Sequence, residues 1–121
     1  MRELIYKVVE SFYEKATKDI LIGHHFDKFS GPLELKVHLE RITSFWEMQL
    51  TGSTSVPLNG PFHLLFTHLQ LKIKRGELGR WIILFHQTLD SYELDAELVE
   101  YWKQRIALFE ERFKSHPQMF N

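Results

Sequence analysis

Apolar residues recur at helical spacing along most of the chain, and this periodicity constrains the fold more than any other feature of the sequence. The first stripe consists of Leu4, Ile5, Val8, Val9, Phe12 and Ala16, and the second of Leu35, His38, Ile42, Phe45, Trp46 and Gln49. The third consists of Trp81, Leu84, Phe85, Thr88 and Leu89, and the fourth of Leu94, Leu98, Tyr101, Trp102, Ile106, Phe109 and Phe113. No segment shows the alternation of a half-buried strand. The sequence therefore predicts an all-α fold.

Glycine and proline mark the breaks between these segments. They cluster in residues 30–32 and 51–61, while Gly76 and Gly79 indicate a weaker third break. We expect four main helices between the breaks, and a short fifth helix around His68.

Two helix ends are also predicted. Pro32 fits the first turn of the second helix, because a backbone N–H is not needed there. Asp90 or Ser91 is expected to cap the last helix, because short polar side chains accept a hydrogen bond from the first free N–H groups.

Length and composition predict one domain, residues 1–121, with its own core, because 44% of the residues are hydrophobic and 14% are aromatic. The absence of cysteine excludes disulfides, a thiolate nucleophile and a cysteine zinc site. A formal net charge of −1 argues against nucleic acid or an anionic membrane as a partner. The charged N-terminus and the lack of a long apolar segment favour a cytoplasmic protein, with a monomer as the default.

Two of the seven histidines stand in apolar surroundings. His38 lies on the second stripe, and His68 lies in the apolar run of residues 62–71. A buried imidazole needs partners for both ring nitrogens. Each could be a core histidine bonded to a carbonyl, or a ligand of a metal or cofactor. The residues by themselves leave both interpretations open.

The remaining histidines support no chemistry of their own. His24, His25 and His116 are predicted at the surface, and His86 at the surface or half buried. A histidine zinc site is poorly supported, because no His-Glu-x-x-His helix occurs and His63 and His68 stand five residues apart.

Several residues with chemical potential follow one another in a distinctive order. The order is Phe12-Tyr13-Glu14-Lys15, Phe26, His38-x-x-x-Ile42-x-x-Phe45-Trp46, Gly60-Pro61, His68-Leu69-x-Leu71 and Arg80-Trp81-Ile82-x-Leu84-Phe85. This ordered set, from about Phe12 to Phe85, resembles the truncated haemoglobins, and most of all their third group.

The resemblance implies a globin-like two-over-two helical sandwich around haem b. His68 stands at the position of the proximal histidine that ligates iron, and a neutral imidazole suits that role. Tyr13, His38 and Trp81 stand at the distal positions that face a bound gas. Their O–H and N–H groups are donors that could stabilise a ligand carrying partial negative charge.

The resemblance also implies the walls of the haem pocket. Phe26 stands where globins pack a phenylalanine against the porphyrin, and Arg41 stands where a side chain can reach a haem propionate. Ile42, Phe45 and Trp46 stand on the distal helix.

Two departures affect the proximal side. The segment between Trp46 and His68 is a few residues longer than the family pattern, so His63 is a rival for the iron ligand. Leu58 stands where an aromatic residue is common.

By this resemblance the function is binding of dioxygen, nitric oxide and carbon monoxide. Three distal donors favour nitric oxide dioxygenase or peroxidase-like redox chemistry, or ligand sensing, over bulk transport, and a reductase would be the partner. Whether His38 ligates iron when no gas is bound stays open. The alternative function is that of a haem-free helical interaction module.

Overall fold

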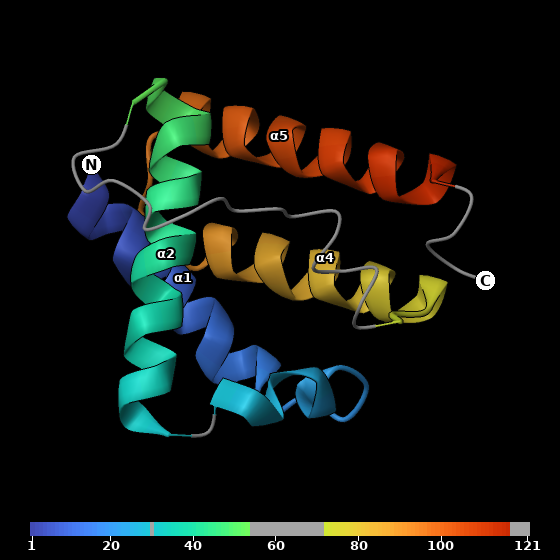
Figure 1. The fold of residues 1–121 in the computed structure, drawn as a ribbon. Helices are drawn as coiled ribbons and strands as arrows, with labels where there is room; N and C mark the ends of the chain where they lie inside the picture. The colour runs from blue at the N-terminus through green and yellow to red at the C-terminus, as the bar shows by residue number, and fades with distance from the viewer. Residues whose placement is uncertain (30, 54–71, 117–121) are drawn as a thin grey trace. The chain divides into compact units, whose positions relative to one another are not determined.

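The computed structural model describes residues 1–29, 31–53 and 72–116. Its elements are α1 (Arg2–Ala16), the 3-10 helix η1 (Gly23–Phe29), α2 (Pro32–Thr51), α4 (Arg75–Asp90) and α5 (Ala96–Ser115) (Figure 1). The described residues contain no strand, so the all-α prediction is confirmed, and α1, α2, α4 and α5 match the four apolar stripes. The short helix predicted around His68 lies outside the described residues.

The chain folds as two compact units, Met1–Phe62 and His63–Asn121, and each is described by itself. In the first unit, α1 and α2 pack together and run in roughly opposite directions, and η1 contacts α2. The apolar stripe of α1 drives this packing, because Ile5, Val8 and Val9 are completely buried. Polar and charged residues outside this stripe make α1 amphipathic.

Helix α2 has a glycine next to each end, and the conformation requires a glycine only at the second. Gly31 is the extended residue before the helix, and Pro32 occupies the first turn, as predicted. At the other end Gly52 has a φ of 85°, in the left-handed region that a side chain would strain. Its N–H donates to the Met48 carbonyl and closes the last turn.

The second unit is built on α4 and α5, which lie side by side and antiparallel in Figure 1. Phe85 and Trp102 meet with ring centroids 5.7 Å apart, and both side chains are almost fully buried. At the turn between the helices, Lys103 Nζ lies 2.8 Å from Asp90 Oδ1. Burial of large apolar side chains therefore holds this unit, because the ion pair is exposed and contributes little.

Two local predictions were wrong. The last helix is capped by Asp95, whose Oδ1 accepts the Glu97 N–H at 2.8 Å, and neither Asp90 nor Ser91 caps it. Gly76 and Gly79 lie inside α4, which already begins at Arg75. Glu77 stabilises this early start of α4. Its Oε1 accepts the N–H of Lys74 at 2.8 Å, a backbone donor just before the helix.

None of the described helices combines the length and low charge content that crossing a bilayer requires.

Candidate functional site

Two polar side chains predicted for the distal site meet in the first unit. Tyr13 lies in the last turn of α1 with 8% of its surface exposed, and half-buried His38 lies in the second turn of α2. The Tyr13 hydroxyl oxygen is 2.8 Å from His38 Nε2, which is a good hydrogen-bond distance. The tautomer of His38 decides which atom donates. The sequence placed both residues at the distal site, and the structure brings them together.

Aromatic rings hold Tyr13 in place. Phe26, on η1, meets the Tyr13 ring edge-on at a centroid distance of 5.2 Å, and Phe12 does so at 5.4 Å. The His38 ring approaches the same phenol at 5.3 Å, also nearly perpendicular. Edge-to-face contacts of this kind are favourable and directional, so the phenol has little freedom to turn. Phe26 thus lies beside Tyr13, and its predicted contact with a porphyrin stays a prediction.

Burial keeps Tyr13 in its neutral form. Removal of the phenol from water raises the pKa of Tyr13 far above its ordinary value of 10, because the phenolate would be poorly solvated. Tyr13 therefore stays protonated and serves as a neutral hydrogen-bonding group. It is not available as a general base at neutral pH.

The hydroxyl of Thr17 forms a hydrogen bond with the backbone of Tyr13. Thr17 Oγ1 donates to the Tyr13 carbonyl at 2.8 Å where α1 ends, and the same carbonyl also accepts the Thr17 N–H at 3.0 Å. The apolar periodicity could not reveal this support, because Thr17 lies just after the stripe. A threonine four residues after a buried tyrosine was the available sequence signal.

The other predicted pocket residues of α2 form an apolar surface. Phe45 and Trp46 are 9% and 3% exposed, and their rings meet nearly edge-on at 5.2 Å. Ile42 and Arg41 are half buried. This mixture of apolar wall and basic edge is compatible with the roles that the resemblance implies for them.

The remaining site predictions fall elsewhere. Trp81 is half buried on α4 in the second unit, where its ring lies 5.6 Å from Phe85. His68 and its rival His63 lie outside the described residues. The proximal ligand therefore stays a prediction.

Of the other described histidines, His24 and His86 have the predicted exposure, while His25 and His116 are more buried than predicted. His24 is exposed, His25 and His116 are half buried, and the ring centroids of His24 and His25 lie 4.0 Å apart with the rings tilted by 39°. His86 is half buried on α4, and within the described part of the chain its buried Nε2 has no hydrogen-bond partner. Desolvation, and then the nearby charge of Lys103, lower the pKa of His86.

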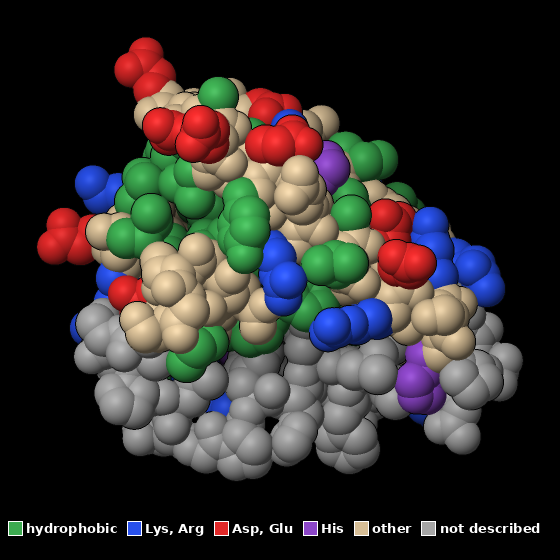
Figure 2. Space-filling model, turned by 90° about the horizontal axis from the view of Figure 1, so that it is seen from above, with side chains coloured by type: hydrophobic (Ala, Val, Ile, Leu, Met, Phe, Trp, Pro, Cys, Tyr) green, Lys and Arg blue, Asp and Glu red, His purple; other side chains and the backbone are tan. Residues whose placement is uncertain are grey.

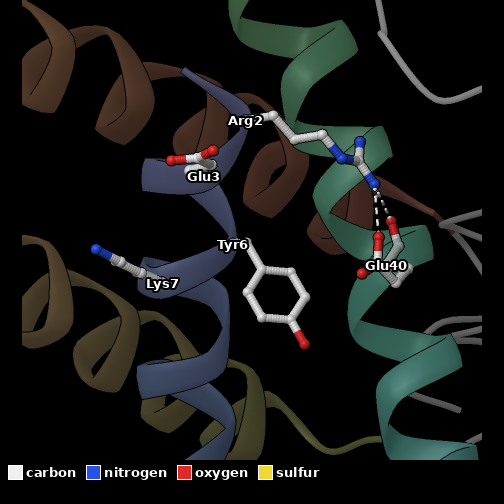
Figure 3. A pocket seen from close by; sticks show the side chains of 5 residues that line it. All are labelled: Arg2, Glu3, Tyr6, Lys7 and Glu40. Atoms are coloured by element: carbon white, nitrogen blue, oxygen red, sulfur yellow. Dashed lines mark hydrogen bonds and ion pairs between the residues drawn. The ribbon is translucent and has the colours of Figure 1, made fainter.

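A polar cluster at the start of α1 was not predicted. Arg2 reaches from α1 to three residues of α2, Glu40, Ser44 and Glu47. An open depression of about 350 Å³ lies beside it, with Tyr6 among its lining residues (Figure 3). Burial, with smaller contributions from Glu10 and Glu40, raises the pKa of the Tyr6 phenol. The only sequence signal was the helical spacing of the three acceptors.

Hydrophobic side chains also reach the surface, as Figure 2 shows on one face of the molecule. Leu33 and Val37, one turn apart on α2, are 71% and 53% exposed, and Tyr101 and Leu108 on α5 are 44% and 42% exposed. Scattered exposure of this kind is normal for a folded protein. It gives no specific support to an interaction module.

The distal residues fit a haem group with a gas ligand. Tyr13 remains a neutral phenol, and a neutral polar group can bond a small ligand without competing as an anion for the metal. The aromatic and apolar residues around it supply the low-polarity wall that a porphyrin requires.

Comparison with known proteins shows the same fold in a protein of known type. The crystal structure of a group III truncated haemoglobin from Campylobacter jejuni matches with a TM-score of 0.81 and 28% identity, over 94% of this chain and 88% of that chain. A scan against models of protein families and a search of curated proteins each found no match. The similarity confirms the predicted fold class and supports a globin-type function with a haem cofactor. The chain therefore has the fold of the truncated haemoglobins, and its similarity is to their third group.

Proposed function

We propose that this chain binds haem b and uses it to bind dioxygen and other diatomic ligands. The observation that carries the proposal is the hydrogen bond of 2.8 Å between the Tyr13 hydroxyl and His38 Nε2, inside a cage of aromatic rings. These are two of the three residues that the family pattern assigns to the distal side. The similarity to a truncated haemoglobin supports the same function.

In this proposal each residue has a separate task. Haem, when bound, supplies the iron atom to which the diatomic ligand attaches. His68 would hold that iron, and Phe26, Ile42, Phe45 and Trp46 would exclude water from the porphyrin. Arg41 would pair with a propionate.

The distal groups act on the ligand. Tyr13 holds a proton on its hydroxyl oxygen at neutral pH, because burial raises its pKa. It can therefore donate to a ligand whenever His38 supplies the donor of their mutual hydrogen bond, or whenever that bond opens. Trp81 adds an indole N–H. Each such bond contributes roughly 1 kcal/mol net, and more where water is excluded.

A polar distal side of this kind favours slow release of the ligand. We therefore favour oxidation of nitric oxide, peroxide-type redox chemistry or ligand sensing over bulk transport. A nitric oxide dioxygenase or a peroxidase-like enzyme needs electrons from a reductase, which would be the protein partner. A cytoplasmic location and a monomeric state remain predictions.

Replacement of the two candidate iron ligands tests the proximal assignment. His68→Gly should abolish tight haem binding or its five-coordinate ferrous spectrum, and added imidazole should restore the spectrum because it replaces the missing ring. His63→Gly is the matched control and should leave the spectrum as in the wild type. The reverse result would make His63 the ligand, and no change in either variant would contradict the proposed haem site.

A further inference from the structure

We propose that Arg2 is a positioning residue. Its hydrogen bonds to one side of α2 fix the rotation of that helix, and this rotation keeps His38 Nε2 within hydrogen-bond distance of the Tyr13 hydroxyl. Arg2 touches neither Tyr13 nor His38 in the described contacts, so it would act through the placement of α2. Only the expected effect on ligand binding rests on the proposed function. The hydrogen bond between Tyr13 and His38 is present without haem.

The contacts of Arg2 span two turns of α2. One terminal nitrogen lies 2.9 Å from Ser44 Oγ and 3.3 Å from Glu47 Oε1. The other lies 2.9 Å from Glu40 Oε2 and 3.3 Å from the Glu40 carbonyl oxygen. Figure 3 shows the Arg2 side chain extending from α1 toward Glu40 on α2. A planar guanidinium can hold several acceptors in a fixed geometry, which a flexible ammonium cannot.

Part of this cluster is shielded from water. The side chain of Arg2 is 18% exposed, that of Glu47 is 10% exposed and Ser44 is buried, whereas the side chain of Glu40 is 46% exposed. Screening by solvent and salt is weaker for the shielded groups than for a fully exposed pair. Through Ser44 and Glu47, Arg2 therefore forms a stronger connection than an ordinary surface salt bridge.

Arg2 and Tyr13 hold α2 from the same face of α1. A helix turns about 100° per residue, so the eleven-residue separation places them roughly 20° apart around α1 and about 16 Å apart along it. Each end of this face carries one polar connection to α2, Arg2 to the Glu40 cluster and Tyr13 to His38.

On α2, the residues bonded to Arg2 and the residue bonded to Tyr13 lie on opposite sides of the helix. By the same helical geometry, Glu40, Ser44 and Glu47 lie roughly half a turn around the axis from His38. Rotation of α2 that loosens one flank therefore also displaces the other. At about 5–6 Å from the axis, a 10° rotation moves a side chain by about 1 Å, which is enough to break a hydrogen bond.

The other buried contacts of α2 are less directional. Thr43 is fully buried, but its hydroxyl donates to the Leu39 carbonyl of its own helix at 2.7 Å and adds no connection to α1. Leu39 is a buried apolar side chain, and apolar packing is non-directional. The directional hydrogen bonds of Arg2 are thus well suited to fix the rotation of α2 about its axis.

The test is the state of the His38 ring in the full chain. Long-range nitrogen–proton NMR spectra of labelled histidine report the Nε2 shift and the tautomer, and Tyr13→Phe supplies the reference for a broken hydrogen bond. A haem-loaded sample is measured in its diamagnetic carbon monoxide form. We expect Arg2→Met to move the His38 Nε2 shift toward the Tyr13→Phe value, and Arg2→Lys to move it part of the way.

Asp95→Ala is the matched control, because it weakens α5 without touching α1 or α2. It should lower the melting temperature while the His38 shift stays at the wild-type value. A wild-type His38 shift in Arg2→Met would overturn the proposal, whatever happens to stability. If Arg2→Met does not fold, the Arg2→Lys and Glu47→Gln variants test the proposal in its place. A His38 Nε2 shift unchanged from the wild type in both variants would overturn the positioning role of Arg2.

The visible spectrum of the same samples tests the proposed function separately. Absence of haem with a displaced His38 shift would contradict haem binding and leave the positioning role standing. In a haem-binding protein, Arg2→Met should also speed dioxygen release, by a smaller factor than Tyr13→Phe does.

Discussion

At the scale of single residues, the hydrogen bond between Tyr13 and His38 is the centre of the site. The order of residues along the chain pointed to this pair, since each stands at a family position. Their distance could not be predicted from the sequence, because it depends on how α2 is rotated against α1. The contribution of Arg2 was missed for the same reason, because its three acceptors are 38–45 residues away in the chain.

Tyr13→Phe should speed the release of dioxygen from the haem-loaded protein. The change removes the hydroxyl but keeps the ring and its contacts with Phe12 and Phe26. Loss of roughly 1 kcal/mol corresponds to about fivefold faster release, and more if water is excluded. Stopped-flow measurement of the release rate checks this. Phe12→Leu is the control for packing alone, and a release rate in Tyr13→Phe no faster than in that control would contradict a distal role for the hydroxyl.

His86 should make the free energy of unfolding depend on pH. Its folded pKa lies below the ordinary 6.5, because burial and Lys103 outweigh the opposite influence of Asp90 and Glu110. The unfolded chain then binds more protons, so stability is fully present above about pH 6.5 and falls as the pH drops through the folded pKa.

His86→Gln should remove the part of the decrease in the free energy of unfolding at low pH that is due to His86. Urea unfolding of both proteins between about pH 5 and pH 8 measures it, and the difference between the two curves isolates His86 from the other histidines. Parallel curves over the whole range would show that His86 does not titrate differently in the folded protein.

At the scale of elements, periodicity predicted the helices well and their ends poorly. The stripes located α1, α2, α4 and α5, because burial of an apolar face is the main source of helix stability. The start of α4 and the cap of α5 depend on single hydrogen bonds, those of Glu77 and Asp95, and competing polar residues nearby made them ambiguous. Gly76 and Gly79 were misleading because a glycine weakens a helix without ending it.

Gly79→Ala should therefore stabilise the protein. Gly79 lies inside α4, and no described atom lies within 4 Å of an added Cβ. Alanine favours the helix by about 0.5–1 kcal/mol over glycine. Gly52→Ala is the contrasting variant, because its φ of 85° strains any side chain even though the space around it is open. Thermal unfolding should show a higher melting temperature for the first and a lower one for the second, and a lower value for both would contradict the assignment of Gly79 to the helix interior.

At the scale of the whole molecule, the family resemblance and the structural similarity agree. The ordered residues from Phe12 to Phe85 suggested a truncated haemoglobin, and the match over 94% of the chain confirms that fold. Hydrophobic spacing alone led only to an all-α protein, because many helical folds share it. The proximal side remains a prediction, since His68 and His63 lie outside the described residues.

The visible absorption spectrum of the purified full chain after addition of haemin tests haem binding most directly. We expect a sharp Soret band at one equivalent of haemin, which persists through gel filtration and shifts when the reduced protein is exposed to carbon monoxide. An equal concentration of haemin without protein supplies the baseline. A spectrum that stays at this baseline would contradict haem binding and leave a haem-free helical module as the function of this chain.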